Sequence, residues 1–364
     1  MSDFLFENIK ISGIASAVPK SIVKVNSFQD TFGAATVQKF IDTTGINEYR
    51  KTCEHQTASD LGFAAAEHLI DRQKIDRKEI GALVFVAHST DYRRPATACV
   101  LHKRLGLEKN CTAFDINLGC SAFVYGIQVT ASMMMCSDIN KALLIVGETL
   151  TKMVNPKDSS TAMLFGDGGS AILLEKTNDA CEIRGVLKTD GEGYKSIIAP
   201  AGGFRNMNAV TDEMVWGDGN IRTLYNTNMN GVDVFSFTVT EVPRTIKDFL
   251  RKNERTVDDY DVLAIHQANY FIHQQLSKKL KVPIDKMPIC LDRYGNTSAP
   301  AIPILLCDVF GGEQNKSVKA LMCGFGVGLS WGVLEADLDV NNIYPIIETD
   351  EYYKEGIING PDDM

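Results

Sequence analysis

The sequence predicts an α/β fold built from two similar halves, and two observations support this prediction. Apolar runs of strand length alternate with amphipathic stretches of helical length, the pattern of strands covered by helices. Similar motifs also recur at a nearly constant distance, because His88 and His266 lie 178 positions apart, as do Lys141 and Lys319, and Gly119 and Gly295 lie 176 apart. This agreement indicates an internal duplication of about half the chain.

The first half shows strands and helices in regular alternation. A predicted strand at 4–16 precedes a turn near Pro19, and the run IGALVFVAH is continuous enough for a strand buried on both faces. For the helix at 57–73, Ser59 is the candidate N-cap. The other predicted elements are a helix near 35–43, the strand at 80–88, a helix at about 96–105, a strand at 111–117, a helix at 121–137 and a strand at 141–148.

The second half repeats this order after a stretch rich in glycine and asparagine. Residues 186–232 predict long loops, which either line a site or form a surface excursion. The alternation then returns with a helix at 234–252, a strand within 259–269, the motif YGNTSA at 294–299 after a short strand and before a helix, and a strand at 319–326. We expect halves at 1–178 and 179–338, followed by an acidic, solvated tail at 339–364.

Cys120 lies at a predicted strand-to-helix turn within DINLGCSAFVYG, residues 115–126. Unpaired N–H groups and the positive end of a helix dipole favour a thiolate, which is the nucleophilic form of cysteine. The alternative is an inert structural thiol, because cysteine is often buried and the chain contains nine. The position of Cys120 therefore makes it a candidate nucleophile.

Composition excludes several classes of function. The net charge of −9 without a Lys/Arg cluster argues against a nucleic-acid partner. The nine cysteines include no CxxC pair, and no paired histidine spacing suggests a metal site, so we expect reduced thiols and no metal. No segment approaches the ~18 apolar residues of a membrane span. These features predict a cytoplasmic protein without a membrane partner.

The duplication places further polar residues near Cys120. Asn296, in YGNTSA, corresponds to Cys120 in the first half, and His266 ends the strand that corresponds to the one ending at His88. If the halves pack with pseudo-twofold symmetry, these turns meet at their shared boundary, where small-molecule sites commonly lie. We therefore expect Cys120, His266 and Asn296 to form one site.

Five motifs in this order resemble the thiolase superfamily and, within it, the ketoacyl-[acyl-carrier-protein] synthase III family. They are GCSAFVYG around Cys120, FGDGGSAILL at 165–174, HQAN at 266–269, DRYGNTSAPAIP at 292–303 and GFGVGLSWG at 324–332. The resemblance extends from about residue 8 to 336. It implies a thiolase fold, in which two βαβαβ halves form an α-β-α-β-α sandwich. FGDGG precedes a strand rather than a helix, so we interpret it as structural and not as a phosphate loop.

The resemblance also implies a mechanism in which Cys120, His266 and Asn296 are catalytic. The cysteine would take the acyl group from a thioester, and His266 and Asn296 would donate hydrogen bonds to the enolate formed when a malonyl thioester loses carbon dioxide. Backbone N–H groups of Cys120 and Val327 would hold the oxyanion. The implied substrates are thioesters of coenzyme A or phosphopantetheine, with no tightly bound cofactor.

Several positions depart from the family pattern and bear on the substrate. The family's coenzyme-binding tryptophan and arginines align with Lys39, Thr43 and Ser159, which weakens the case for acetyl-coenzyme A. Basic positions for the carrier protein align with Ser236 and Phe271, although Lys278 and Lys279 remain. The aromatic residue that closes the acyl pocket across the dimer aligns with Arg94. We expect the substrate pocket to include Arg94, Phe325, Asn269 and Phe271.

Arginines at 93 and 94 have two interpretations. They could recognise a polar or carboxylated acyl group, or they could be a surface pair before a helix that starts at Pro95.

We expect a homodimeric acyltransferase that performs decarboxylative condensation in fatty-acid or specialised acyl-chain synthesis, with acyl carrier protein or acyl-coenzyme A as partner. The main alternative passes the acyl group from Cys120 to an oxygen or nitrogen nucleophile without decarboxylation. A cysteine hydrolase lacks support, because the sequence around Cys120 is not of the protease type. A non-catalytic subunit is disfavoured because all three candidate catalytic residues are present.

Overall fold

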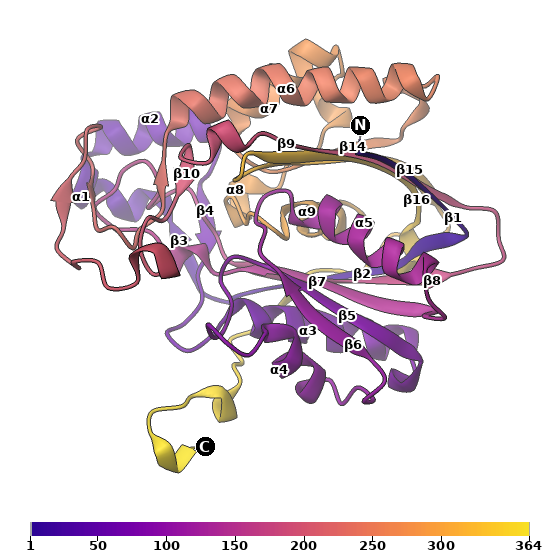
Figure 1. Ribbon diagram of the computed structural model, residues 1–364. Coiled ribbons are helices and arrows are strands. Elements are labelled where there is room, and N and C mark those ends of the chain that lie inside the picture. The colour runs from indigo at the N-terminus through magenta and orange to yellow at the C-terminus, as the bar shows by residue number, and fades with distance from the viewer. Residues whose placement is uncertain (1, 364) are drawn as a thin grey trace.

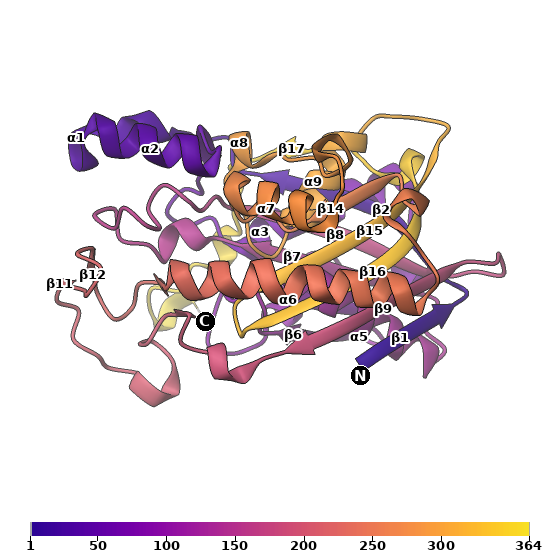
Figure 2. The same cartoon turned by 90° about the horizontal axis from the view of Figure 1, so that it is seen from above.

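A computed structural model, which describes residues 2–363, shows five layers in the order α-β-α-β-α (Figure 1). Two sheets face each other with a pair of helices between them, and further helices cover both outer faces. The predicted fold class is therefore confirmed. Figure 2 looks down on the outer helix α6 (Gly231–Lys252) and the sheet beneath it.

The first sheet has six strands in the order β17-β2-β8-β7-β5-β6. β5 pairs in parallel with both β6 and β7, whereas β8 is antiparallel to β7 and β2. Because β5 and β6 run in parallel, the turns that follow them lie at the same edge of the sheet. The bounds are β2 (Ile9–Val18), β5 (Ile80–Val86), β6 (Thr112–Ile116), β7 (Lys141–Glu148), β8 (Gly168–Lys176) and β17 (Ile347–Glu348).

The second sheet has the order β1-β9-β16-β15-β14, and β9, β16, β15 and β14 repeat the strand directions of β2, β8, β7 and β5 in the first. β14 is parallel to β15, and β16 is antiparallel to both β15 and β9, as β8 is to β7 and β2. This equivalence is what an internal duplication predicts. The bounds are β1 (Ser2–Glu7), β9 (Glu182–Thr189), β14 (Val262–Ile265), β15 (Ser317–Gly326) and β16 (Ser330–Asp339).

Among the described residues 2–363, the second sheet has no counterpart of β6. The sequence predicts a short strand before YGNTSA, but residues Leu291–Tyr294 form the short helix α8 instead, so this prediction is wrong. The N–H of Gly295 donates to the carbonyl of Leu291, and the N–H of Cys290 donates to the side chain of Gln267. These local bonds use the backbone groups that a strand would have offered to its neighbour.

Helices α5 (Ala122–Met135) and α9 (Ala301–Phe310) form the central layer, where each contacts both sheets. Both sequences are apolar on nearly all sides, as expected for helices buried between two sheets. Helices α3 (Ala58–Gln73) and α4 (Thr97–Arg104) cover the first sheet. The amphipathic α6 and α7 (Tyr270–Leu280) cover the second.

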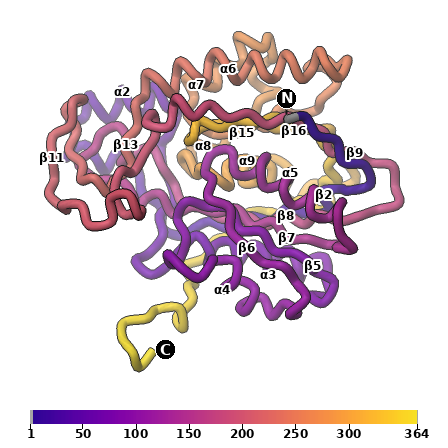
Figure 3. Tube along the Cα trace, in the orientation of Figure 1, coloured from indigo at the N-terminus to yellow at the C-terminus, as the bar shows by residue number. Residues whose placement is uncertain are grey.

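A cap of short elements and long loops lies at one end of the sandwich, on the left in Figures 1 and 3. Most of the predicted loop region 186–232 is here, although β9 extends to Thr189. The short elements are β3 (Ile22–Lys24), α1 (Gln29–Phe32), α2 (Ala34–Thr44), β4 (Glu48–Arg50), β10 (Ile197–Ile198), β11 (Met214–Val215), β12 (Ile221–Arg222) and β13 (Asn228–Met229).

Two local predictions in the first half need correction. The single strand predicted at 4–16 is two strands in different sheets, because the chain turns at Asn8, whose φ is 61°. The N-cap of α3 is Thr57 rather than Ser59, and Thr57 forms a capping box with Asp60. The Ser59 hydroxyl instead donates to Asp91.

The segment after Leu338 is not a fully solvated tail as predicted. Strand β17 pairs in parallel with β2, and Tyr344 is buried against α3 and the first sheet. The Gln56 amide donates to the carbonyl of Thr349 at 3.0 Å. Further on, the N–H of Tyr353 donates to Asp60 of α3, and the hydroxyl of Tyr92 donates to the carbonyl of Gly356. Only the residues after this contact extend away from the sandwich, where the chain ends in short turns (Figure 1).

Candidate active site

Cys120 lies in the turn between β6 and α5, where Ser121 is the N-cap residue. Its Sγ is 3.4 Å from the hydroxyl of Ser298, in the turn before α9. The Ser121 hydroxyl contacts the Ser330 hydroxyl at 2.7 Å, which ties the start of α5 to β16. Residues from both halves therefore fix the cysteine, as the duplication predicts.

The pKa of the Cys120 thiol is raised, mainly by burial. The Ser298 hydroxyl and the backbone N–H of Val327 oppose this shift by stabilising the thiolate, while the negative charge of Glu148 adds to it. We predicted that the helix terminus would make the thiolate the favoured form of Cys120. This is wrong for the net pKa, because desolvation of the buried sulfur is the largest effect and favours the thiol. Cys120 is a thiol at rest and must lose its proton during acyl transfer.

His266 follows β14 and faces the same cavity as Cys120. The backbone N–H of His266 donates to the Cys323 carbonyl at 2.9 Å. The imidazole ring packs edge-on against Phe325, with the two ring centroids 5.3 Å apart. Burial lowers the pKa of His266 to about 3. The imidazole is therefore neutral at physiological pH and can donate one hydrogen bond without carrying a charge.

Asn296 lies between α8 and α9 and is fixed through both its backbone and its side chain. Its N–H donates to the Leu164 carbonyl at 2.9 Å, and its carbonyl accepts from Gly166 at 3.1 Å. Its side-chain Oδ1 accepts from the N–H of Ser298 at 2.9 Å. Because Oδ1 is used in this way, the amide NH₂ is the group available to donate into the cavity.

The FGDGG motif is structural, as predicted, and it holds the turn that carries Asn296 rather than a phosphate group. A methyl group on Gly166 would lie 2.0 Å from the carbonyl oxygen of Tyr294, so only glycine allows this close approach. The buried carboxylate of Asp167 accepts hydrogen bonds from Thr52 and Thr151. The motif therefore joins β8 to the loops that carry the site.

A cavity of about 920 Å³ opens in front of Cys120, His266 and Asn296, so the structure brings the three predicted catalytic residues together. One wall comes from the ends of β5 and β6 and is polar. The mouth is apolar, with Val232 78% and Phe271 40% exposed. Side chains that line the cavity include His88, Thr90, Arg93, Asn117, Leu150, Met153, Leu164, Phe165, Met229, Phe235, Ile272 and Ser298.

Three of the four predicted pocket residues line this cavity. Phe325 packs against His266, Phe271 stacks on Phe235, and Asn269 caps α7 by accepting the N–H of Ile272 at 2.8 Å. Arg94 is exposed, and it is not part of the cavity lining within residues 2–363.

The neighbouring Arg93 does line the cavity, and its guanidinium donates to the Gly202 carbonyl at 3.0 Å. At the position of a family coenzyme-binding arginine, both the N–H and the hydroxyl of Ser159 donate to Asn220.

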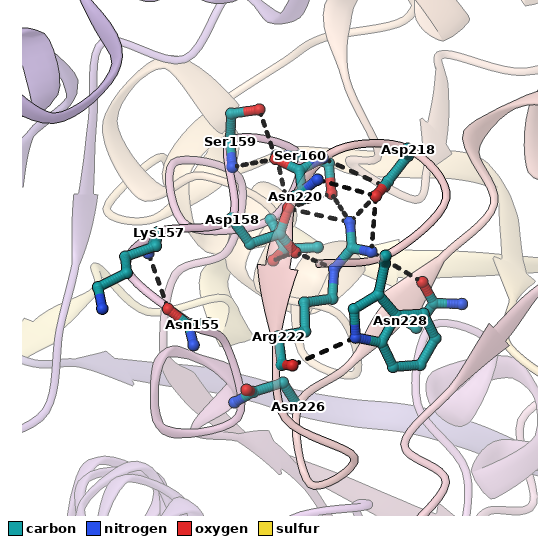
Figure 4. Close-up of polar contacts among 12 residues, drawn as sticks. Asn155, Lys157, Asp158, Ser159, Ser160, Asp218, Asn220, Arg222, Asn226 and Asn228 are labelled. Atoms are coloured by element: carbon teal, nitrogen blue, oxygen red, sulfur yellow. Dashed lines mark hydrogen bonds and ion pairs between the residues drawn. The ribbon is translucent and has the colours of Figure 1, made fainter. Parts of the chain in front are cut away.

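A buried ion pair anchors the loops on one side of the cavity. The Arg222 side chain is 0% exposed, and it donates from Nε to Asp158 at 2.6 Å and from Nη2 to Asp218 at 2.6 Å. Figure 4 shows Ser160 and Asn228 completing the surroundings of the guanidinium. Asp158 precedes Leu164 and Phe165, and Arg222 precedes Thr227 and Met229, which line the cavity. The network therefore joins two lining segments.

Sequence reasoning did not single out Ser298, whose hydroxyl lies 3.4 Å from Cys120 Sγ. A signal for Ser298 was present, because it lies 178 positions after Cys120, the same offset as between His88 and His266. For Gly326 the signal is the glycine-rich run GFGVG, because glycines let the backbone approach a site closely, and the structure places Gly326 against the Cys120 side chain.

No cluster of three metal-ligating side chains occurs within residues 2–363. In the same part of the chain, no helix combines the length and the apolar character that crossing a bilayer requires. All nine cysteines are unpaired.

Comparison with known proteins identifies the family. Residues 114–191 match 3-oxoacyl-[acyl-carrier-protein (ACP)] synthase III, and residues 250–335 match its C-terminal part. A β-ketoacyl-[acyl-carrier-protein] synthase III of Clostridioides difficile is 34% identical over 88% of this chain and 96% of its own length. The corresponding protein of Streptococcus gordonii is 33% identical over 89% of this chain and 98% of its own.

Solved structures agree with this assignment. A 3-oxoacyl-(acyl-carrier protein) synthase from Burkholderia xenovorans superimposes with a TM-score of 0.89 and 34% identity, covering 95% of this chain and 99% of that one. OleA from Xanthomonas campestris has a TM-score of 0.77 at 21% identity over 92% of this chain and 99% of that one, a likeness of fold alone.

Proposed function

Because the chain belongs to the 3-oxoacyl-[acyl-carrier-protein] synthase III family, we propose that it condenses an acyl thioester with a malonyl thioester. The product is a 3-oxoacyl thioester, and carbon dioxide is released. The observation that carries this proposal is the convergence of Cys120, His266 and Asn296 on one cavity. A thiol, a neutral imidazole and a carboxamide supply a nucleophile and two uncharged donors, which suits enolate chemistry.

Acylation is the first half of the proposed reaction. The Cys120 sulfur attacks the thioester carbonyl, the new carbon–sulfur bond forms, and the thiolate of the carrier leaves and takes up the proton lost by Cys120. The N–H groups of Val327 and of Cys120 itself stabilise negative charge at this sulfur, so both point towards the reacting atoms. We propose that they hold the carbonyl oxygen as it becomes an oxyanion.

Condensation is the second half. The bond between the malonyl carboxylate and its α-carbon breaks, carbon dioxide leaves, and the electron pair remains as an enolate. His266 and the Asn296 NH₂ donate to the enolate oxygen. The α-carbon then attacks the acyl group on Cys120 and releases its thiolate, which regains a proton. A neutral His266 suits this step, because it stabilises the enolate without giving a full proton to the carbon.

The substrate thioesters reach Cys120 through the mouth formed by α6 and α7. Ser159 is bonded to Asn220, so no arginine fork is available at this position for coenzyme A phosphates. We propose that the carrier is the phosphopantetheine arm of an acyl carrier protein, with coenzyme A as the other possible donor. No resident cofactor takes part in either half-reaction.

We also propose that the enzyme is a homodimer in the cytoplasm. Strand β6 is an edge strand of the first sheet, and its Phe114 and Ile116 are only half-buried. A second copy would cover this edge. An uncovered edge strand can otherwise pair with strands of unrelated chains. The free thiols of all nine cysteines support a reducing compartment.

The proposal is tested by two measurements on one sample. Intact-protein mass spectrometry after incubation with acyl thioesters should show one acyl group on Cys120, and none on the Cys120→Ala variant. Addition of malonyl-carrier protein should then release carbon dioxide and remove the acyl group. If the acyl group instead passed to an alcohol or amine without carbon dioxide release, the enzyme would be a non-decarboxylative acyltransferase and the condensation proposal would fail.

A further inference from the structure

Ser298 places a buried hydroxyl against the sulfur of Cys120. The two residues come from different halves of the duplicated fold, since Cys120 lies in the turn before α5 and Ser298 in the turn before α9. The hydroxyl oxygen and Sγ are 3.4 Å apart, and Ser298 is only 2% exposed. Ser298 also lines the cavity in front of Cys120. A polar group with a proton to donate therefore lies directly at the atom that reacts.

The backbone of Ser298 has a conformation that favours glycine over serine. Its φ is +57°, in the left-handed region that residues with a side chain rarely adopt. The N–H of Ser298 donates to Oδ1 of Asn296 at 2.9 Å, and its carbonyl accepts the N–H of Ala301 at 3.2 Å, so the turn is held on both sides. Backbone strain of this kind occurs often at functional sites. The hydroxyl, which a glycine would lack, is the part of Ser298 that can have a function.

Only the Ser298 hydroxyl can donate in this contact once Cys120 has lost its proton. In the thiol form, either the S–H or the O–H can be the donor. A thiolate has no hydrogen and can only accept, so the O–H must then donate to the sulfur. Within residues 2–363, the sulfur is the only hydrogen-bond partner of this hydroxyl. No other acceptor in this part of the chain therefore competes for its proton.

Three ionisable side chains lie near this contact. His88 and His266 line the same cavity, and Glu148 lies behind His88 and accepts its backbone N–H at 2.9 Å. Burial lowers the pKa of His266, which keeps its ring neutral, and the charge of Glu148 raises the pKa of the Cys120 thiol. Of the groups that lower the Cys120 pKa, the Ser298 hydroxyl has the largest effect. It is therefore the side chain best placed to stabilise the thiolate.

We propose that Ser298 is a further catalytic residue, whose hydroxyl donates a hydrogen bond to the Cys120 sulfur whenever that sulfur carries negative charge. This inference rests on the proposed condensation and deepens it. During acylation, the bond strengthens as Cys120 loses its proton and attacks the thioester carbonyl. During condensation, attack by the α-carbon breaks the carbon–sulfur bond and leaves the electron pair on the sulfur, which accepts the same bond again. Ser298 keeps its own proton in both steps.

A titration of Cys120 tests the contact without any substrate. The ultraviolet absorbance of the thiolate is followed against pH in the wild type and in Ser298→Ala. The curve of each protein with Cys120→Ala added is subtracted, which removes the contribution of the other cysteines. A hydrogen bond to a charged group is worth about one pKa unit or more, so the Cys120 pKa should be about one unit higher in Ser298→Ala than in the wild type.

Single-turnover acylation with a butyryl thioester measures the effect on the reaction. Near neutral pH, Ser298→Ala should take up the acyl group about threefold to fivefold more slowly than the wild type. Fewer of its molecules carry a thiolate, although a thiolate of higher pKa is the better nucleophile and recovers part of the loss. Ser298→Gly also lacks the hydroxyl but adopts the positive φ without strain, so it should be slowed to the same extent. The exposed Ser21→Ala is the control and should react as the wild type.

The outcomes separate the hydroxyl from the backbone. An unchanged Cys120 pKa in Ser298→Ala would overturn the proposal, because the hydroxyl would then not stabilise the thiolate. Acylation at the wild-type rate by Ser298→Gly would also overturn it, since only the backbone of the turn would then matter. Thermal unfolding of each variant verifies that the rates and titrations are measured on folded protein.

The two measurements also keep this inference distinct from the proposed function. If wild-type protein takes up no acyl group from any thioester, the proposed function fails, while the titration still shows whether Ser298 stabilises the thiolate. If acylation of the wild type is normal but the Cys120 pKa does not depend on Ser298, the proposed function stands and the role of Ser298 fails.

Discussion

Gly326 lies against the side chain of Cys120, so closely that a methyl group on the glycine would be 2.6 Å from Cβ and 2.8 Å from Sγ. Real Cβ atoms do not approach other atoms this closely, so the end of β15 requires a residue without a side chain. The adjacent Val327 supplies an N–H that stabilises the thiolate. The close approach therefore places a backbone donor at the nucleophile.

The variant Gly326→Ala should slow acylation of Cys120 by about 100-fold, because displacement of the sulfur by even 1 Å misaligns its attack. The rate of acyl uptake, followed by intact mass over time, measures the effect. Gly217→Ala is the matched control, since a methyl group there meets no atom within 4 Å. Equal acylation rates for the two variants would show that the contact between Gly326 and Cys120 is unimportant.

Asn296→Asp should reduce carbon dioxide release by about 100-fold or more, while acyl uptake falls much less. The aspartate can still accept the N–H of Ser298, so the turn is kept, but it no longer offers an NH₂ donor to the enolate. Single-turnover assays of acylation and of malonyl decarboxylation separate the two steps. The same change at the exposed Asn359 is the control. A parallel loss of both steps would argue against the assigned role of Asn296.

His273 makes the folded protein sensitive to acid. It is buried on α7, and burial lowers its pKa to about 4, although the nearby backbone of Met287 and Pro288 opposes the shift. The unfolded chain binds a proton near pH 6.5, whereas the folded chain does not until about pH 4. Stability contributed by neutral His273 is therefore complete above pH 6.5 and is lost as the pH falls towards 4.

His273→Leu should remove this titration. Between pH 7 and pH 5, the free energy of unfolding of the variant should fall by about 2 kcal/mol less than that of the wild type, since one pKa unit corresponds to about 1.4 kcal/mol. Urea unfolding at the two pH values measures the difference. His102→Leu, at the surface, should behave as the wild type. An identical pH dependence for His273→Leu and wild type would contradict the buried neutral state.

Arg222→Met should lower the free energy of unfolding by about 3 kcal/mol or more, because it leaves the fully buried Asp158 without its charge partner. Arg293→Met is the matched control. Arg293 also forms a bidentate pair, with Asp308, but its side chain is 47% exposed, so its loss should cost about 1 kcal/mol or less. Denaturant unfolding compares the two, and equal losses would show that burial of the Arg222 pair has no special effect.

The sequence by itself determined the fold class and the order of the elements. Continuous apolar runs such as Ile80–Val86 are local patterns, and their repetition at a fixed offset was enough to predict two similar sheets. The same reasoning found Cys120, His266 and Asn296, because each lies in a turn next to a predictable strand or helix. It was wrong about the strand before YGNTSA, where local turn bonds replace sheet pairing.

Only the tertiary structure decided the chemistry around these residues. The raised pKa of Cys120, the lowered pKa of His266, and the approach of Gly326 to the sulfur all depend on contacts between segments far apart in the chain. The same holds for Glu148 behind His88 and for the exclusion of Arg94 from the cavity lining within residues 2–363. The periodicity of apolar residues shows which face of a helix or strand is buried. Desolvation and hydrogen bonding depend on which segment covers that face, and only the tertiary packing determines that segment.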